Sequence, residues 1–423
     1  MDPAASILDA LLTQNESQAN CTIDLGLSRM EALLAALGQP HAQLGPVIHV
    51  AGTNGKGSLI AFLTAMLQAA GYTVATYTSP HLITIHERIQ RNGQPVDDGL
   101  LRAQAQRVLD TEASKEATFF ERLTAVAFGV FQIWCAEDPQ TVVLLETGLG
   151  GRLDATNVVH PTVTAITSMG LDHQAYLGSD MASIAREKAG ILKKGVPVVA
   201  APADDEALSV IQAHAQQVGA PLLAAGLSYH WQAGPAGWYE DEEGRIPLPQ
   251  PALAGHHQWD NAAQAVAVAR QLMQMGWSLS KDDLRSGVAS AYWPGRLEQV
   301  ATEPSIWLDG AHNPVAAQCC ADFFRQQGGV DVMLFALMAD KDRDAMLRPW
   351  LGVVKEVVVV EPVGGRAVEA KLLVQCWNKH GVKAEIATST EQGLQLVRKK
   401  VSQGGKILVS GSLYLVGEAK KLL

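Results

Sequence analysis

Gly52-Thr53-Asn54-Gly55-Lys56-Gly57-Ser58 is a short glycine-rich stretch that predicts the architecture around it. It follows the apolar run at residues 47–51, which predicts a buried strand, and it precedes a helical pattern at residues 59–70 that ends at Gly71. A glycine-rich turn between a strand and a helix N-terminus points backbone N–H groups inward, where they bind phosphate. Lys56 adds a positive charge against the terminal phosphates of a nucleotide.

The stretch departs from the general phosphate-binding loop, G-x-x-x-x-G-K-[ST]. That pattern needs glycine at position 50 and a hydroxyl residue at position 57, where this chain has Val50 and Gly57. The loop is therefore shorter, and its hydroxyl residue comes one position late. An ordinary β–α turn is the alternative, but the flanking strand and helix favour a nucleotide site formed by Gly55, Lys56, Gly57 and Ser58.

Size and composition indicate a globular protein with more than one domain. The chain has 423 residues, 48% of them hydrophobic, enough for two or three cores. No apolar run reaches the roughly 18 to 20 residues of a membrane span, and we expect no signal peptide and no membrane partner. Five scattered cysteines argue against a disulfide framework and indicate the cytoplasm. The net charge of −10 disfavours nucleic acid, although a local basic pocket can still bind anionic substrates.

Strand-like and helix-like segments alternate along the chain, which predicts an α/β fold with a mainly parallel sheet. Strands are predicted at residues 74–78, 142–146, 163–167 and 196–200, and helices include 123–136, 184–192, 206–218 and about 259–275. Residues 227–251 break this rhythm and predict a small β meander or an extended insertion. The alternation restarts after Arg296, with strands at 306–308, 332–337, 356–360, 385–387 and 407–409. We expect a P-loop ATPase domain at 1–296 and a smaller Rossmann-like domain at 297–423.

A second glycine-rich segment, ETGLGGRLDATN at residues 146–157, begins where an apolar strand ends. A carboxylate at the carboxyl end of a buried parallel strand lies where open α/β sheets bind ligands, and beside a triphosphate it can hold Mg²⁺. The alternative is a strand-end glutamate that faces water. The glycines that follow Glu146 favour the metal site, because they indicate close approach of the backbone to another group.

Other predicted strand ends carry polar residues with candidate roles. Ser79 and His173 offer an oxygen and a nitrogen to a metal ion, and Asp309 offers a carboxylate to a ribose. Taken singly, Ser79 is equally well explained by an ordinary Ser-Pro turn, a structural role is favoured for His173, and the alternative for Asp309 is a helix cap or a surface residue. Lys188, on a predicted helix, would alone be interpreted as a solvated charge.

Taken together, these segments resemble one family. In chain order the motifs are GTNGKGS, TSPHL, FFE, ETGLGGRLDATN, LDH, REKAGI, PGR and DGAHNP. They are similar to the motifs of folylpolyglutamate synthase, in the form that is also dihydrofolate synthase, and the similarity runs from Ile23 to Tyr414. The shortened phosphate loop and ETGLGGRLDATN are the most specific of them. The family shares its fold with the Mur ligases of cell-wall synthesis.

The resemblance implies a metal centre and its catalytic residues. Two Mg²⁺ ions would be held by Ser79 and Glu146 at one site and by Glu146 and His173 at the other. Lys188 matches a lysine that is carbamylated in the family, a modification that would make it an anion able to meet the second metal. Lys56, His173 and Lys188 are therefore the implied catalytic residues.

The resemblance also implies binding residues and partners. ATP-contacting positions match Asn261, Arg296, Asp309 and His312, and pterin-binding positions match Thr118, Phe119, Phe120, Glu121, Leu153, Asp154 and Ala155. The distal domain is implied to bind glutamate, with no residue assigned, and some bifunctional relatives have histidine where this chain has Tyr414. The implied ligands are ATP, Mg²⁺, dihydropteroate, folates and L-glutamate, with a monovalent cation as a further candidate, and the family suggests a monomer.

The implied reaction is ATP-dependent amide formation. The carboxylate of dihydropteroate, or the γ-carboxylate of a folate's terminal glutamate, attacks the γ-phosphate of ATP and forms an acyl phosphate. The amine of L-glutamate then displaces phosphate. Two alternatives remain open: a Mur-type ligase acting on a UDP-linked cell-wall precursor, and an ATP-dependent conformational switch, which needs only one Mg²⁺ and which the paired metal candidates therefore disfavour.

Overall fold

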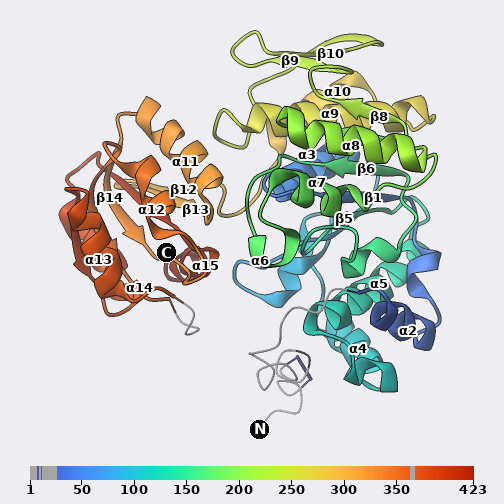
Figure 1. Cartoon of the computed structure of the whole chain (residues 1–423), viewed down its shortest axis with the longest axis horizontal. Helices are drawn as coiled ribbons and strands as arrows, with labels where there is room; N and C mark the ends of the chain where they lie inside the picture. Colours follow the sequence, from blue (N-terminus) through green and yellow to red (C-terminus); the bar gives the residue numbers. More distant parts are fainter. Residues whose placement is uncertain (1–6, 9–10, 12–25, 363–366) are drawn as a thin grey trace. The chain divides into compact units, whose positions relative to one another are not determined.

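The computed structural model describes residues 7, 8, 11, 26–362 and 367–423, so Cys21 and the start of the family similarity at Ile23 lie outside it (Figure 1). The chain forms two compact units. One consists of Met1–Pro251 and Asp260–Ala291, and the other of Ala252–Trp259 and Tyr292–Leu423. The functional division into 1–296 and 297–423 stays a prediction.

The first unit is built on an eight-stranded sheet with the order β4-β3-β2-β5-β1-β6-β7-β8. All neighbours pair in parallel except at the β2–β3 and β3–β4 steps, so β3 and β4 form an antiparallel edge. The strands are β1 (Val47–Ala51), β2 (Val74–Tyr77), β3 (Ile89–Arg91), β4 (Gln94–Pro95), β5 (Val142–Glu146), β6 (Val163–Ile166), β7 (Val198–Ala200) and β8 (Leu222–Ala224). The predicted mainly parallel α/β architecture is confirmed.

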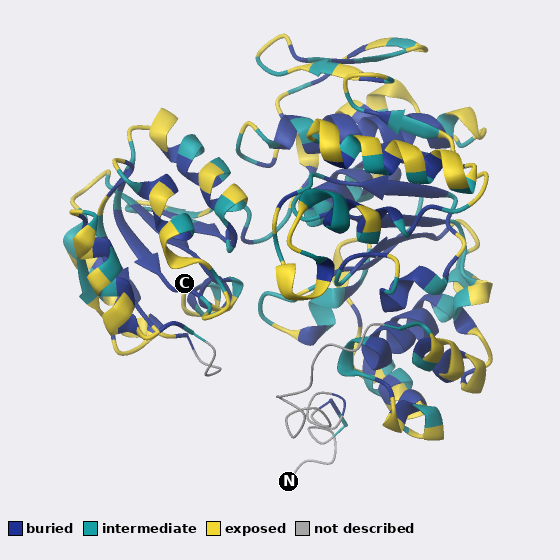
Figure 2. Ribbon diagram, in the orientation of Figure 1, coloured by how far each residue is buried: buried dark blue, intermediate teal, exposed yellow. Residues whose placement is uncertain are grey.

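Helices cover both faces of this sheet, which is why its central strands are mostly apolar and are buried along their whole length (Figure 2). One core cluster joins α2, α4 and α5 to the sheet, and another joins α7 and α8 to it. The α-helices are α2 (Ser28–Ala36), α3 (Lys56–Ala69), α4 (Asp98–Leu109), α5 (Phe119–Glu137), α6 (Gln174–Leu177), α7 (Met181–Ala189), α8 (Asp205–Val218), α9 (Gln258–Gln274) and α10 (Lys281–Ser290). Short 3₁₀ helices are η2 (Pro40–Gln43), η3 (Ile85–Arg88), η4 (Glu112–Lys115) and η5 (Ala155–Val158).

Helix α5 has the length and apolar composition of a membrane span, and it is the one such helix in the described ranges. However, 67% of its apolar window is buried inside the protein, as in the core helix of a globular domain. Packing within the first unit therefore accounts for its composition. The absence of a membrane partner stays a prediction.

The predicted meander is confirmed as a three-stranded antiparallel sheet of β9 (His230–Gln232), β10 (Trp238–Asp241) and β11 (Gly244–Pro247). Arg270 of α9 anchors it, because its Nε and Nη2 donate to the two oxygens of Asp241 at 2.9 and 3.0 Å. The Tyr239 hydroxyl donates to the same carboxylate at 3.1 Å. This buried ion pair fixes the meander on the helix.

The second unit has a six-stranded sheet in the order β12-β13-β17-β14-β15-β16, parallel except for β12. Its core is rich in large aromatic side chains, among them Phe324, Phe335, Trp350 and Trp377. The strands are β12 (Glu298–Thr302), β13 (Ser305–Asp309), β14 (Val330–Phe335), β15 (Val354–Val359), β16 (Lys383–Ile386) and β17 (Lys406–Ser410). The helices are α11 (Pro314–Gln326), α12 (Arg343–Leu347), η6 (Arg348–Trp350), α13 (Ala370–Lys379), α14 (Thr390–Lys400) and α15 (Leu413–Leu422). The second α/β domain is thus confirmed.

Candidate active site

The shortened phosphate loop lies between β1 and α3, as predicted. Gly55 precedes α3 with a φ of 91°, a left-handed conformation that favours glycine. A Cβ atom at Gly55 would also lie 2.5 Å from Oδ1 of Asn261 on α9. The structure therefore brings one predicted ATP-contacting residue directly against the loop, where any larger side chain would displace it.

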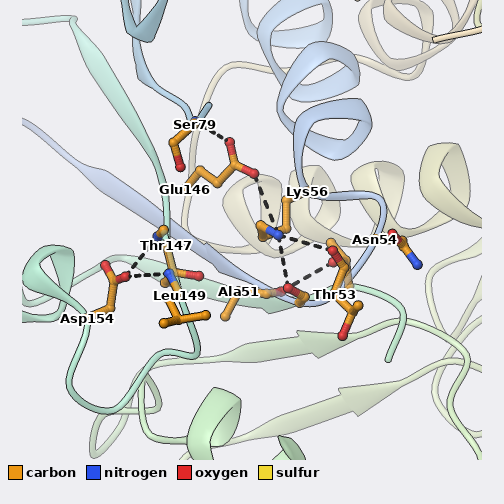
Figure 3. Close-up of polar contacts among 12 residues, drawn as sticks. Ala51, Thr53, Asn54, Lys56, Ser79, Glu146, Thr147, Leu149 and Asp154 are labelled. Carbon is orange, nitrogen blue, oxygen red and sulfur yellow. Dashed lines mark hydrogen bonds and ion pairs between the residues drawn. The ribbon is translucent and has the colours of Figure 1, made fainter. Parts of the chain in front are cut away.

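Lys56 crosses the mouth of the loop (Figure 3). Its Nζ donates to the carbonyl oxygens of Gly52 at 3.0 Å and Thr53 at 3.2 Å. The same Nζ lies 3.8 Å from Oε1 of Glu146. The ammonium group is thus held between the loop and an acidic side chain, close to where phosphate would bind.

Glu146 stands at the carboxyl end of β5, beside Val50 of β1 in the parallel register. Its side chain is buried, and Oε2 accepts a hydrogen bond from the backbone N–H of Ser79 at 2.9 Å. Ser79, Glu146 and Lys56 therefore lie side by side, although they come from three separate segments (Figure 3). This is the arrangement expected for a carboxylate that meets a nucleotide-bound cation.

Lys188 of α7 is buried, and its Nζ donates to the carbonyl oxygen of Gly52 at 2.9 Å. Lys56 donates to this same oxygen, so two lysine side chains converge on the loop. Burial, followed by the charge of Lys56, lowers the pKa of Lys188 to about 7. A lysine in this state is partly neutral near neutral pH, and a neutral amine is a nucleophile.

Glycines in the ETGLGGRLDATN segment let α7 approach closely enough to place Lys188. The N–H of Arg152 donates to the carbonyl oxygen of Glu187 at 2.7 Å. A Cβ atom at Gly151 would lie 2.9 Å from the carbonyl oxygens of both Glu187 and Lys188. Close backbone approach, which the sequence indicates for these glycines, is confirmed, and the group approached is a helix of the same domain.

Asp154 is buried and fully engaged within its own loop. Its Oδ2 accepts the N–H groups of Gly148 and Leu149, each at 2.8 Å (Figure 3). Its Oδ1 accepts the N–H of Thr156 at 3.0 Å. Burial raises its pKa, while these hydrogen bonds oppose the shift. The structure thus gives Asp154 an organising role for the loop that includes Leu153 and Ala155. Pterin binding by these three residues stays a prediction.

Thr118, Phe119, Phe120 and Glu121 open helix α5. Thr118 accepts the N–H of Glu121 at 3.2 Å and donates its own N–H to Glu121 Oε2 at 2.6 Å, which forms a capping box. Phe120 lies against the glycine-rich loop, since a Cβ atom at Gly148 would be 2.4 Å from its ring. Two motifs assigned to the pterin are therefore adjacent in space.

Removing the capping hydroxyl tests this helix start. Thr118→Ala is expected to lower the free energy of unfolding by about 1 kcal/mol, because the N–H of Glu121 loses its partner at the cap. Urea-induced unfolding measures the change, and Thr118→Ser, which keeps the hydroxyl, is the matched control. Equal stabilities of the alanine and serine variants would show that the cap contributes nothing.

Arg29 is a residue of this region that the sequence does not reveal. Its Nη2 lies 3.1 Å from Oε1 of Glu121, and its Nε donates to Oε2 at 3.2 Å. The two residues are 92 positions apart, and a lone arginine on an amphipathic helix carries no local signal. Glu121 is therefore held from two sides, by α2 and by its own helix start.

The proposed metal ligands come from different parts of the site, since the backbone N–H of Ser79 donates to Glu146 while His173 lies on another loop. His173 is exposed at the N-terminus of α6, with a φ of 52°, on the loop that follows β6. Among the described residues, no group of three or more His, Cys, Asp or Glu side chains is arranged to hold a metal ion. Mg²⁺ beside a nucleotide keeps water and phosphate ligands, so one or two protein ligands at each metal suffice. The pairing of Glu146 with Ser79 or His173 at a metal stays a prediction.

The second unit brings Arg296, Asp309 and His312 into one loop region. Asp309 is buried and accepts the N–H groups of Leu297 at 2.8 Å and Ala311 at 2.9 Å. Nδ1 of His312 donates to the carbonyl oxygen of Gly310 at 2.8 Å. A Cβ atom at Gly310 would lie 3.0 Å from Nη1 of Arg296. The DGAHNP and PGR motifs are thus neighbours, while their contacts with ATP stay predictions.

The sequence and the fold were compared with those of known proteins. The family model for the Mur ligase glutamate ligase domain matches residues 295–413. The dihydrofolate synthase/folylpolyglutamate synthase of Bacillus subtilis is 37% identical over 418 residues, which cover 94% of this chain and 95% of the relative. The Escherichia coli protein of the same description is 34% identical over 428 residues, covering 99% and 96%.

Solved structures agree with these relatives. E. coli FolC in complex with DHPP and ADP superimposes with a TM-score of 0.88 at 32% identity, covering 99% of this chain and 98% of that one. The bifunctional folylpolyglutamate synthase/dihydrofolate synthase with Mn, AMPPNP and L-glutamate bound gives 0.85 at 31% identity, covering 99% and 97%.

The fold and the site thus define an ATP-dependent ligase of the Mur ligase type. The chain belongs to the dihydrofolate synthase/folylpolyglutamate synthase family, whose members join glutamate to folates. The resemblance seen in the sequence is confirmed. The Mur-type ligase of a cell-wall precursor and the conformational switch are therefore set aside.

Proposed function

We propose that this enzyme activates two kinds of carboxylate with ATP and joins each to L-glutamate. The first is the carboxylate of dihydropteroate, and the second is the γ-carboxylate of a folate's terminal glutamate. The observation that carries the proposal is the meeting of Lys56, Lys188 and Glu146 at the phosphate loop. A phosphate-binding loop with a lysine and a carboxylate at its mouth suits phosphoryl transfer to an anion.

The main barrier in this step is electrostatic, because an anionic carboxylate must approach the γ-phosphate. Lys56 lies where its charge offsets that of the transferring phosphoryl group, and the N-terminus of α3 adds the favourable end of a helix dipole. The ammonium group of Lys56 is held before the substrate arrives by the carbonyl oxygens of Gly52 and Thr53. Preorganised charge of this kind stabilises the transition state more than it stabilises the bound substrate.

Two divalent cations are part of the proposal. Glu146 with Ser79 would hold one, and Glu146 with His173 the other, and the cations would supply charge neutralisation at the phosphates. Lys188 would become a further anionic group when carbamylated. Its pKa of about 7 leaves a fraction of the amine unprotonated near neutral pH, and an unprotonated amine can add CO₂. The carbamate would replace a buried cation by an anion beside the second metal. Mn is present in a related structure with AMPPNP and L-glutamate.

The organic substrate is proposed to lie on the surface formed by the start of α5 and the ETGLGGRLDATN loop. Phe119 and Phe120 offer aromatic faces for a pterin ring, and Phe120 already contacts the loop. Thr118 and Glu121 hold the helix start, while Leu153, Asp154 and Ala155 complete the opposite side. A related structure contains DHPP together with ADP.

The second unit is proposed to bind L-glutamate, and ATP contacts are proposed for Asn261, Arg296, Asp309 and His312. The match of residues 295–413 to the glutamate ligase domain model supports the glutamate-binding role of the second unit. A monomeric state, a cytoplasmic location and a bound monovalent cation are part of the same proposal. Tyr414, exposed on α15, lies where some bifunctional relatives have histidine.

A coupled ADP-release assay tests the proposal. Dihydropteroate and tetrahydrofolate are supplied separately, each with ATP, Mg²⁺ and L-glutamate, and the product is identified by its mass. We expect ADP release to require one pterin substrate together with L-glutamate, and each product to gain one glutamate residue. ADP release that is independent of the pterin substrate, or that follows a UDP-linked sugar instead, would contradict the proposal.

A further inference from the structure

His49 is a polar residue in the middle of an apolar strand at the centre of the sheet. Strand β1 pairs with β5 on one side and β6 on the other, and its remaining residues are valine, isoleucine and alanine. The His49 side chain is completely buried. Its Nε2 lies 2.8 Å from Oγ1 of Thr156, a residue 107 positions away.

The direction of each hydrogen bond in this contact is determined by its neighbours. Oγ1 of Thr156 donates its one proton to Oδ1 of Asp154 at 2.6 Å, because both oxygens of this side chain also accept backbone N–H groups and so act as acceptors. The hydroxyl must therefore accept from His49, whose Nε2 carries the proton. Nδ1 of His49 then has a lone pair, and within the described part of the chain it has no hydrogen-bond partner. An apolar residue here would avoid that cost, which points to a function for the hydrogen bond at Nε2.

The hydrogen bonds from His49 through Thr156 to Asp154 form a relay, which ends at the backbone turn of the proposed pterin surface. Oδ2 of Asp154 holds this turn, because it accepts the N–H groups of Gly148 and Leu149. Gly148 in turn meets the ring of Phe120. A residue in the core of the sheet is thus connected, through two side chains, to the turn that faces the aromatic residues.

The phosphate loop is held independently of this relay, although His49 precedes it on the same strand. Its carbonyl oxygens at Gly52 and Thr53 accept from Lys56, and Oγ1 of Thr53 donates to the carbonyl oxygen of Gly170 at 3.0 Å. None of these bonds uses His49 or Thr156. Loss of the relay should therefore disturb the pterin side of the site and leave the nucleotide side largely intact.

We propose that His49 and Thr156 are positioning residues for the pterin substrate, which act by holding Asp154 and through it the turn at Gly148 and Leu149. The proposal rests on the assignment of the pterin to this turn in the proposed function. Neither residue touches the reacting atoms. Their effect is on where the turn lies, and so on the KM for the pterin substrate.

Thr156→Val is the direct test, because it removes the hydroxyl and keeps the shape. The KM for dihydropteroate is expected to rise about tenfold or more, since a hydrogen bond to a charged group is lost, while the KM for ATP changes less than about threefold. Thr164→Val is the matched control, as Thr164 is equally buried on β6 and donates to the carbonyl oxygen of Pro197. Thr156→Ser should restore a near-normal KM because it returns the hydroxyl.

His49→Gln and His49→Leu test the other end. Glutamine can still donate a hydrogen bond to Thr156, so the KM for dihydropteroate should rise in His49→Leu and stay close to normal in His49→Gln. Selective labelling with ¹⁵N-histidine adds a readout that does not depend on activity: the resonance lost in His49→Gln should show a neutral ring protonated at Nε2. Burial, with Lys193 nearby, lowers the His49 pKa to about 3, in agreement with a neutral ring.

These experiments distinguish a failure of the relay from a failure of the proposed function. If the wild-type enzyme turns over dihydropteroate but Thr156→Val and Thr164→Val have equal KM values, the relay is refuted and the proposed function stands. Equal rises in the KM for ATP and for dihydropteroate, or a ring protonated at Nδ1, would also refute it. If Thr156→Val does not fold, as thermal unfolding would reveal, the serine and glutamine variants and the NMR signature decide. A wild-type enzyme inactive on dihydropteroate and folates would refute the proposed function itself.

Discussion

Replacing Glu146 by glutamine is expected to lower kcat by about a thousandfold at saturating Mg²⁺. The amide keeps the shape of the side chain, and its oxygen can still accept the N–H of Ser79. What it loses is the negative charge beside Lys56 that would hold the metal ions at the phosphates. A thousandfold corresponds to about 4 kcal/mol of transition-state stabilisation, which is the scale of metal-assisted phosphoryl transfer.

The matched control is Glu137→Gln, an exposed carboxylate on α5 that pairs with Arg91. It should retain nearly full activity. Steady-state ADP release measures kcat for both variants, and circular dichroism with thermal unfolding shows whether the fold is intact. A folded Glu146→Gln enzyme with normal kcat would refute the metal assignment at this position.

Replacing Lys188 by alanine is expected to have the second large effect, also about a thousandfold on kcat. The substitution removes the buried side chain that reaches the phosphate loop through Gly52. In the proposed mechanism it also removes the carbamate that faces the second metal. Because the truncation leaves room for a small anion, added short carboxylic acids should restore part of the activity.

Lys193→Ala is the control for this prediction. Lys193 follows the same helix, is half-buried, and donates to the carbonyl oxygen of Asn157 at 3.4 Å, away from the phosphate loop. It should show neither the large loss nor the rescue. An active Lys188→Ala enzyme, or equal stimulation of both variants by carboxylic acids, would contradict the assigned role.

The predicted order of strands and helices agrees well with the structure where the pattern is strong. The strand at 142–146 matches β5, and the helical pattern at 206–218 matches α8 to within one residue. The helix predicted at 123–136 begins earlier, at Phe119, because the Thr118–Glu121 capping box opens it. That start was readable from the spacing of a threonine and a glutamate before an apolar run. Hydrophobic periodicity alone missed it.

Short or half-exposed strands were harder to predict. Strand β12 (Glu298–Thr302) lies at a sheet edge, mixes polar with apolar residues and contains a register shift in its pairing with β13. The edge strands β4 and β8 of the larger sheet have only two and three residues. Such segments are defined by the strand beside them rather than by their own composition, so periodicity gives little signal.

In the site too, features encoded by a local motif could be predicted, while features that depend on contacts between distant segments could not. The phosphate loop, Glu146 and the glycine-rich segment follow from motifs that a strand and a helix place at one edge of the sheet. The altered pKa of Lys188 does not, because it depends on burial between segments far apart in sequence. Taken alone, the residue would have been interpreted as a solvated charge. The contact of Arg29 with Glu121 and the relay from His49 to Thr156 likewise leave no local trace.

The most direct test of the account is a crystal structure with a non-hydrolysable ATP analogue and Mn²⁺, which marks the metal positions by anomalous scattering. We expect the β- and γ-phosphates to lie against the loop from Gly52 to Ser58, near Lys56. A metal peak should lie at bonding distance, about 2.1 Å, from a carboxylate oxygen of Glu146. A triphosphate bound elsewhere, or metal peaks with no contact to Glu146, would contradict the central claim.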